Sequence, residues 1–341
     1  MNTRWELAID LGTAFVRMAD AEKGIVVNEP AYIAVHDNGT PVCFGETAYT
    51  LCGREPEGIT VGTCLKNGTL ENPEYANLLI RYLMRRLDGD RRKRHSLLLS
   101  YSPLSRGTQS DALMNAALDA GASDVALVRS DAVGALGSGV DILSPKATFV
   151  IDMGAGKISA TLFSLGREVA YKSLSYGMNV INDRIIDMLR REAGFHIGFQ
   201  TAEELKISLA SAHHGDVPSY TARAAGYNAE TRMPAIMELA PEPVLKICAE
   251  PLNELINMCR DVIVFAPEEL SADLNDCGAI LTGGGAALPG IDKLISDNLH
   301  MPCTIAESPA TCAIKGLHSM LLESGRYEMF IDRRMAIAEK R

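Results

Sequence analysis

Two short segments of the chain place an aspartate and glycines between apolar stretches. They read "AIDLGTAFVRMAD" over residues 8–20 and "IDMGAGKISATLF" over residues 151–163. In both, an apolar strand runs into an aspartate, Asp10 or Asp152, and a glycine follows two positions later. Glycines let such a turn bend with its backbone N–H groups free to face a phosphate. The aspartate suits Mg²⁺, held directly or through water between the carboxylate and phosphate oxygens.

One Asp-Gly turn alone is usually an ordinary hairpin. Two copies at equivalent places favour a clamp that holds a polyphosphate from both sides. A third cluster, Gly283 to Gly285 in "LTGGGAALPG", is predicted to join a strand to the N-terminus of a helix and to approach a ring or phosphate closely. A plain flexible connection is the alternative. The chain has no GxxxxGK[ST] P-loop and no GxGxxG in a Rossmann position.

Composition restricts the class of protein. The 341 residues are 47% hydrophobic and 22% charged, as in a globular protein of two domains or of one fold made of two halves. A net charge of −10 argues against nucleic-acid binding. The eight cysteines are scattered singly, which favours free thiols in the cytoplasm. No apolar stretch approaches the roughly 20 residues of a membrane span, and none near the start resembles a signal peptide.

Strand and helix patterns repeat along the chain and predict an α/β fold of two related halves. Residues 5–35 predict three strands in a meander, and the same pattern restarts after residue 143. The expected helices include 72–87, 179–194, 201–212 opening at Thr201, and a long one at 241–265. The predicted domains are half I at 1–142, with a small subdomain near 31–68, and half II at 143–341, with a small subdomain near 180–240. A C-terminal helix at about 310–341 is expected to pack back on half I.

Taken in order, "DLGT", "GIVVNEPAYIAV", "DMGAG", "TAEELK" and "LTGGGAALPG" resemble the actin superfamily, and within it the bacterial MreB rod-shape-determining proteins. The stretch Asn28-Glu29-Pro30 points to this branch, and the resemblance extends from about residue 5 to 325. It implies an actin-like (ribonuclease H-like) fold around a nucleotide cleft, with ATP or ADP and Mg²⁺ bound between the halves. It also implies self-assembly into filaments at the inner face of the cytoplasmic membrane, where they organise wall-synthesis proteins and help determine cell shape.

The resemblance assigns site residues position by position. Asp10 and Asp152 are the metal-binding candidates. The nucleotide-binding candidates are Gly12, Thr13, Ala14 and Phe15 in the first turn; Gly154, Ala155, Gly156 and Lys157 in the second; Glu203, Glu204, Leu205 and Lys206 beside the ribose and base; and Gly283, Gly284, Gly285 and Ala286 in the adenosine loop.

Several residues depart from the family pattern. The family has Asn where Phe15 stands and Thr where Lys157 stands. The Glu that positions the attacking water is replaced by Ser130, which can hold a water but cannot act as a base near neutral pH. Asp131, one position further, is a weak catalytic candidate and is expected to be a helix N-cap. We therefore expect weak or absent ATPase activity, with Arg129 as a further candidate for binding phosphate.

Two other functions remain open. One is a nonfilamentous actin-like adaptor that binds ATP and recruits partners, and the other is a small-molecule kinase or phosphatase of the same superfamily. A basic loop holds Arg85, Arg86, Arg91, Arg92, Lys93 and Arg94 in the region where MreB relatives meet the membrane. It predicts peripheral attachment to anionic lipid, and a solvated basic loop is the alternative.

Overall fold

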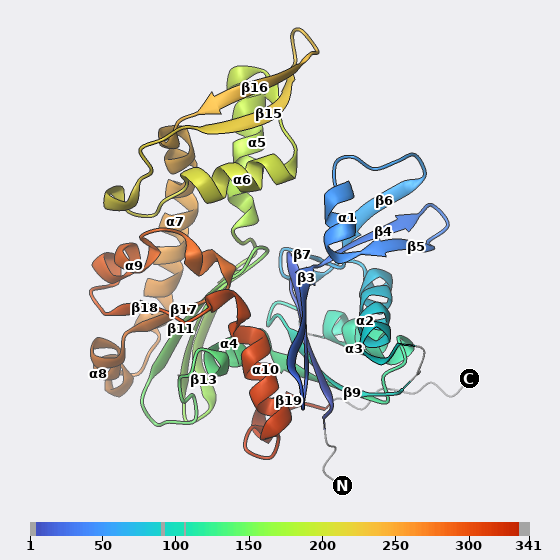
Figure 1. Cartoon of the computed structure of the whole chain (residues 1–341). Helices are drawn as coiled ribbons and strands as arrows, with labels where there is room; N and C mark the ends of the chain where they lie inside the picture. Colours follow the sequence, from blue (N-terminus) through green and yellow to red (C-terminus); the bar gives the residue numbers. More distant parts are fainter. Residues whose placement is uncertain (1–4, 90–92, 106, 334–341) are drawn as a thin grey trace.

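The protein is described here from a computed structural model that covers residues 5–89, 93–105 and 107–333 (Figure 1). Two large sheets lie side by side, each with its own helices and a small subdomain above it. The predicted boundary after residue 142 falls in the segment between a helix of the first half and the first strand of the second.

The first sheet has the strand order β19-β10-β9-β1-β2-β3. Strands β1 to β3 form an antiparallel meander, and β9 and β10 add to β1 in parallel. Its strands are β1 (Leu7–Leu11), β2 (Phe15–Asp20), β3 (Gly24–Pro30), β9 (Ser96–Tyr101), β10 (Asp124–Arg129) and β19 (Ile331–Asp332).

The second sheet has the order β13-β12-β11-β17-β18, again a meander followed by two parallel strands. Its strands are β11 (Thr148–Met153), β12 (Ile158–Ser164), β13 (Arg167–Leu174), β17 (Ala279–Thr282) and β18 (Cys303–Ile305). The order matches β3-β2-β1-β9-β10 strand for strand, so the prediction of an α/β fold with two related halves is confirmed.

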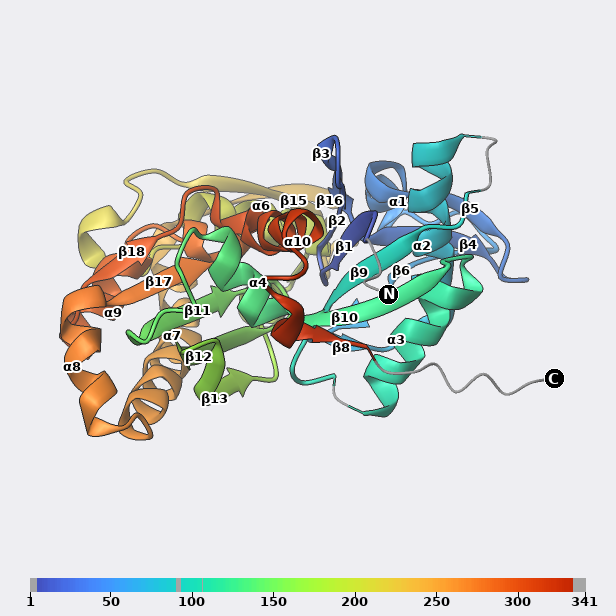
Figure 2. The same ribbon diagram turned by 90° about the horizontal axis from the view of Figure 1, so that it is seen from below.

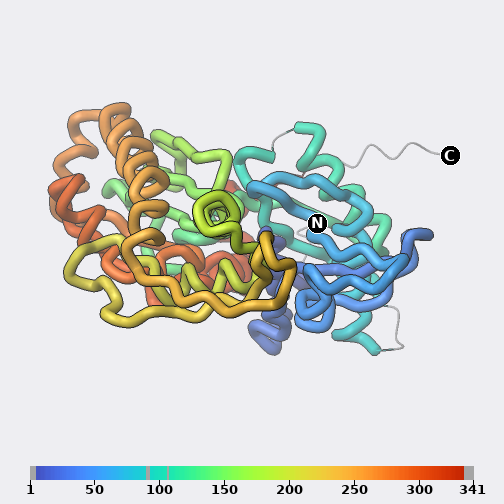
Figure 3. Tube along the Cα trace, turned by 90° about the horizontal axis from the view of Figure 1, so that it is seen from above, coloured from blue at the N-terminus to red at the C-terminus, as the bar shows by residue number. Residues whose placement is uncertain are grey.

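Each large sheet carries a small subdomain at the same end of the molecule, which Figure 3 views from above. The first contains β4 (Tyr32–His36), β5 (Pro41–Phe44), α1 (Gly45–Leu51), β6 (Ile59–Thr63), β7 (Leu65–Lys66) and β8 (Thr69–Leu70). The second contains α5 (Asn179–Ala193), β14 (Phe195–His196), α6 (Phe199–Leu209), the 3₁₀ turn His214–Asp216, β15 (Ala222–Asn228) and β16 (Pro234–Leu239). The side-chain amide of Gln200 donates to the carbonyl of Tyr49 at 2.5 Å and so joins the two subdomains.

Apolar helix faces cover the outer side of each sheet. The cluster on the first sheet includes side chains from α2 (Pro73–Asp88) and α3 (Thr108–Asp119). The larger cluster on the second sheet includes α7 (Pro241–Val264), α8 (Glu268–Cys277) and α9 (Ile291–Leu299), together with α5 and α6. No helix in the described part of the chain is both long and apolar enough to span a membrane.

Two helices, α4 (Ser130–Gly137) and α10 (Cys312–Leu322), lie between the sheets (Figure 2). A Cβ added to Gly137 would lie 1.7 Å from the carbonyl oxygen of Cys312, and one added to Gly316 would lie 1.9 Å from that of Val133. The helices therefore touch backbone to backbone, which only glycine permits. Through α10 and β19, the end of the described chain packs on the first sheet.

Four details differ from the sequence-based expectation. The C-terminal helix expected at about 310–341 is α10, which ends at Leu322 and is followed by a 3₁₀ turn, Glu328–Phe330, and by β19. The third expected strand divides at Ala31 into β3 and β4, which belong to different sheets; the Ala31 N–H donates to the carbonyl of Ala14 at 2.9 Å. Helix α6 begins at Phe199, so Thr201 lies inside it. Glu203 and Glu204, which were expected in the first turn of this helix, fall beyond it. Helix α8 was not expected at all.

The contact between α4 and α10 predicts that Gly316→Ala destabilises the protein by about 3 kcal/mol or more, because the methyl group must displace backbone atoms. Urea unfolding followed by circular dichroism measures the change in unfolding free energy. The control is Gly325→Ala, since a Cβ there has no heavy atom within 4 Å; it should change stability by less than about 0.5 kcal/mol. Equal stabilities for the two variants would contradict the inferred backbone contact.

Candidate functional site

The β1–β2 and β11–β12 turns have the same internal geometry. The Gly12 N–H donates to the carbonyl of Phe15 at 3.0 Å, and the Gly154 N–H donates to that of Lys157 at 2.8 Å. Each aspartate is the next-to-last residue of its strand and lies two residues before the glycine, so Phe15 and Lys157 are equivalent positions. The two turns are therefore structural repeats, which their common sequence pattern predicted.

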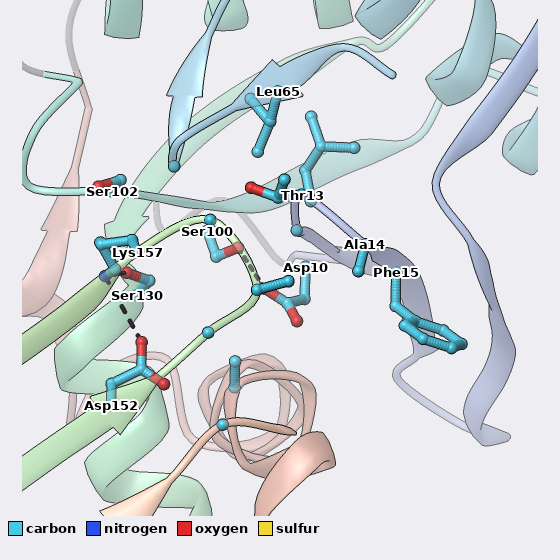
Figure 4. Close-up of a pocket in the computed structure, with 18 of the residues that line it drawn as sticks. Asp10, Thr13, Ala14, Phe15, Leu65, Ser100, Ser102, Ser130, Asp152 and Lys157 are labelled. Atoms are coloured by element: carbon cyan, nitrogen blue, oxygen red, sulfur yellow. Dashed lines mark hydrogen bonds and ion pairs between the residues drawn. The ribbon is translucent and has the colours of Figure 1, made fainter. Parts of the chain in front are cut away.

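The turns meet face to face across a pocket between the two halves (Figure 4). A Cβ on Gly156 would lie 2.3 Å from Thr13 Oγ1 and 2.8 Å from the backbone nitrogen of Gly68. Glycine is required here because the backbones of both halves converge. Of the predicted nucleotide-site residues, the pocket is lined by Gly12, Thr13, Ala14, Phe15, Gly154, Ala155, Gly156, Lys157, Gly283 and Gly284, together with Asp10, Asp152 and Ser130.

Asp10 is 8% exposed and is held by two neighbours. Ser100 Oγ donates to its Oδ1 at 2.7 Å, and Arg17 Nη1 lies 3.5 Å from its Oδ2. Sequence analysis identified neither partner. Arg17 could have been found, because it pairs directly with Asp10 in the β1–β2 ladder, whereas Ser100 arrives through a parallel pairing with β9 that no local pattern reveals.

Asp152 faces the same pocket from the second half. Its Oδ2 lies 3.5 Å from Lys157 Nζ, and its Oδ1 accepts a hydrogen bond from Thr282 Oγ1 at 3.3 Å. Burial raises the pKa of Asp152, the positive charge of Lys157 opposes this, and the nearby charge of Asp10 raises the pKa further. Each candidate metal-binding carboxylate therefore already has a basic side chain 3.5 Å away.

Lys157 forms part of the pocket wall. Its side chain is 7% exposed, and Nζ donates to Ser130 Oγ at 2.9 Å. Figure 4 shows the lysine beside both Asp152 and Ser130, while Phe15 points away from this group. Phe15 is thus 42% exposed, whereas Lys157, at the equivalent position of the second turn, is a buried cation.

The expectation that Asp131 is the N-cap of α4 was wrong. Arg129 is the N-cap residue of α4, and Asp131 lies inside the first turn, so Asp131 is not the cap. Its carboxylate, 1% exposed, accepts hydrogen bonds from Arg129 Nε and Nη2 at 3.1 and 2.5 Å and from Thr161 Oγ1 at 2.9 Å. Arg129 also pairs with Glu168. Neither side chain lines the pocket, and the roles of Asp131 as a base and of Arg129 as a phosphate ligand stay predictions without support from this geometry.

The triple-glycine loop also differs from the prediction. It enters a 3₁₀ turn, Gly284–Ala287, and α9 begins only at Ile291, so the glycines are not at an α-helix N-terminus. Gly283 has φ +81°, and a Cβ there would lie 2.5 Å from the carbonyl oxygen of Met153. A Cβ added to Gly285 would lie 2.6 Å from Met178 Cγ, and Ala286 is fully buried. Gly285 and Ala286 do not line the pocket.

The α6 candidates lie outside the pocket lining. Glu203 and Lys206 form an ion pair at 2.7 Å, and Asn182 Nδ2 donates to Glu203 at 2.6 Å. Glu204 is exposed, and the side chain of Leu205 is buried in the core of the second half, so Leu205 is corrected to a packing residue. The Glu203–Lys206 pair stays a prediction as a base and ribose contact.

The matching family model covers nearly the whole described chain: MreB/Mbl protein, over residues 4–328. The chain belongs to the MreB/Mbl family. The cell shape-determining protein Mbl of Bacillus cereus is 31% identical over 318 residues, which cover 93% of this chain and 95% of Mbl. The expected family resemblance is confirmed.

Solved structures of other proteins have the same fold. MreB5 of Spiroplasma citri bound to AMPPNP has a TM-score of 0.88 and 26% identity, covering 96% of this chain and 99% of MreB5. A second crystal structure of MreB5 is bound to ADP. MamK in a double helical filament has a TM-score of 0.77 at 16% identity, covering 94% of this chain and 99% of MamK. The actin-like fold of this MreB/Mbl member is therefore confirmed.

The buried contacts of Asp131 predict a structural role. Asp131→Ala should lower the unfolding free energy by about 3 kcal/mol, because it removes the buried carboxylate to which Arg129 and Thr161 donate hydrogen bonds. The pKa of Asp131 is lowered in the fold: burial acts to raise it, but Arg129, with help from the charge of Lys157 and the hydrogen bond of Thr161, outweighs burial. The contribution is therefore complete above the ordinary aspartate pKa of about 3.9 and is lost as the pH falls through the folded pKa.

Urea unfolding at pH 7 measures this loss. Asp261→Ala is the matched control, since Asp261 pairs with Lys172 on the surface, where both side chains are about half exposed. It should cost less than about 1 kcal/mol. A loss no larger for Asp131→Ala than for this control would contradict the assignment.

Proposed function

We propose that this MreB/Mbl protein binds ATP or ADP between its halves and assembles into cytoskeletal filaments that help determine cell shape. The observation that carries the proposal is the pair of matching Asp-x-Gly turns that face one pocket. In an actin-like fold, that pocket corresponds to a nucleotide cleft, and MreB5 of Spiroplasma citri has been crystallised with AMPPNP and with ADP.

Magnesium fits the two turns in part. Carboxylate oxygens are donors that Mg²⁺ prefers, and the ion commonly keeps several waters. Asp10 has Arg17 3.5 Å from one carboxylate oxygen and a hydroxyl bond to the other. Asp152 has the matching contacts with Lys157 and Thr282. We therefore assign Mg²⁺ to both carboxylates, held through water.

Weak hydrolysis belongs to the same proposal. Ser130 lines the pocket at the position where the family resemblance places the water-ordering glutamate. Its hydroxyl accepts a hydrogen bond from Lys157, and a serine cannot act as a base near neutral pH. Asp131 is sequestered by Arg129. Neither residue 130 nor residue 131 thus offers a free carboxylate to orient an attacking water.

Head-to-tail contacts that do not close would generate an open filament. We propose that the filament lies at the cytoplasmic face of the membrane and recruits wall-synthesis proteins, as the family resemblance implies. The impaired Ser130 position favours the nonfilamentous adaptor as the second candidate. A kinase or phosphatase would need a substrate pocket beyond the nucleotide site.

Sedimentation of the purified protein with ATP tests the filament proposal. We expect pelletable polymer whose amount rises with salt and Mg²⁺, because subunits of net charge −10 repel one another at low ionic strength. Phosphate release in the same tubes should be slower than that of a family member with the usual glutamate. Protein that binds nucleotide but stays monomeric by light scattering in every condition would replace the filament with the adaptor.

Membrane attachment is proposed from the basic loop after α2. Arg91 and Arg92 lie outside the described residues; Lys93 and Arg94 follow them, and Arg86 is engaged by Glu29. Each Lys or Arg near an anionic bilayer contributes about 1 kcal/mol. The four consecutive basic residues 91–94 could therefore hold the protein at an anionic surface.

Liposome flotation tests this attachment. The protein should float with anionic but not with neutral vesicles, and replacing residues 91–94 with glutamine should abolish flotation. Arg190→Gln with Arg191→Gln is the control, since these are exposed arginines at the end of α5, and flotation should persist. Binding that does not depend on lipid charge would refute the proposal.

A further inference from the structure

Lys157 is a buried lysine whose environment is built by both halves of the protein. Its Cβ lies against Gly68 of the first half, where an added Cβ would be only 2.7 Å away. Its ammonium contacts Ser130 at 2.9 Å and Asp152 at 3.5 Å. With 7% of the side chain exposed, the charge is fixed at the pocket wall and does not extend into solvent.

The charged side chains that line the pocket balance one another. They are two carboxylates, Asp10 and Asp152, and two cations, Arg17 and Lys157. With carboxylates alone, the pocket would carry a formal charge of −2 and would repel a nucleotide's phosphates unless a divalent ion came with them. With both cations present, the formal charge of this lining is zero. An anion can enter without a metal ion to neutralise the site.

We propose that Lys157 supplies the positive charge for the nucleotide's phosphates on the Asp152 side, so that the pocket binds adenine nucleotide with little dependence on Mg²⁺. This inference rests on the proposed nucleotide site and adds the identity of its counter-ion. A lysine ammonium is a compact point charge suited to phosphate. In a buried site, its attraction for an anion is screened less than at the surface.

A metal ion bound directly by Asp152 would have to displace that ammonium or share the carboxylate with it. Two positive charges at one carboxylate repel each other, and Mg²⁺ loses its waters reluctantly. Asp10 has equivalent surroundings, with Arg17 at 3.5 Å from one oxygen and the serine bond on the other. Neither carboxylate is free of a cation, so Mg²⁺ held through water adds to binding but is not required for it.

The test is the affinity of the full chain for ADP, measured by calorimetry in Mg²⁺ and again in EDTA. Wild type should bind ADP with dissociation constants within about threefold of each other in the two buffers. Lys157→Met keeps an unbranched side chain that is only one atom shorter and removes its charge. We expect it to bind within about threefold of wild type in Mg²⁺ and at least about tenfold more weakly in EDTA, since the metal then becomes the only counter-ion on this side.

Two further variants separate the cations. Lys172→Met is the matched control, because Lys172 is an exposed lysine of the same half that pairs with Asp261; it should behave as wild type in both buffers. Asp10→Ala should show the opposite pattern to Lys157→Met, with weaker binding in Mg²⁺ and a much smaller change in EDTA.

The outcomes distinguish the inference from the proposed function. If wild type binds ADP in Mg²⁺ but more than about tenfold more weakly in EDTA, Lys157 does not replace the metal, although the nucleotide site stands. If Lys157→Met loses affinity equally in both buffers, the lysine has only a structural role and the inference is overturned. If wild type binds ADP in neither buffer, the proposed nucleotide site itself falls. The ratio of the wild-type dissociation constants for ADP in EDTA and in Mg²⁺ tests the inference even where Lys157→Met fails to fold.

Discussion

The backbone contact between α4 and α10 is the constraint on which the rest of the molecule depends. Gly137 and Gly316 let the two helices approach until their backbones touch. Helix α10 packs on the first sheet, and α4 packs on both sheets, so the pair joins the two halves. Strands β1 and β11 carry Asp10 and Asp152 near their ends, and the pocket lies between these joined halves. A site whose charged side chains must keep fixed distances from one another needs a close-packed centre of this kind.

Charge balance in the pocket then distinguishes the two otherwise matching turns. The first turn carries its cation on the paired strand, at Arg17, and presents Phe15 outward. The second carries its cation within the turn itself, at Lys157, and directs it at Ser130. The backbone repeats, but the chemistry does not. In the proposed nucleotide site, the repeated backbone positions the phosphates, and the unequal side chains determine how their charge is neutralised.

The sequence predicted what depends on local pattern. Strand meanders, the turns around Gly12 and Gly154, and the pairing of two related halves all follow from apolar periodicity and short motifs. The contacts that define the site depend on distant segments: Ser100 reaches Asp10 through a parallel strand, and Thr161 reaches Asp131 from another sheet. The glycine loop was misassigned because consecutive glycines fit both a helix start and close packing, and only the tertiary neighbours distinguish these.

The Glu29 side chain shows how a family signature can be structural and the departures can be chemical. Glu29, in the stretch that pointed to this family, pairs with Arg86 of α2 and packs against Gly45 at the start of α1. It holds β3, α1 and α2 together and does not line the pocket. Ser130 and Lys157, which depart from the family pattern, contact each other inside the pocket. A glutamate at residue 130 would bring a third carboxylate to the pocket, beside a Lys157 ammonium that already lies 3.5 Å from Asp152. The serine hydroxyl accepts the lysine's hydrogen bond without adding charge. The two departures therefore fit each other, and together they leave the charged side chains that line the pocket balanced.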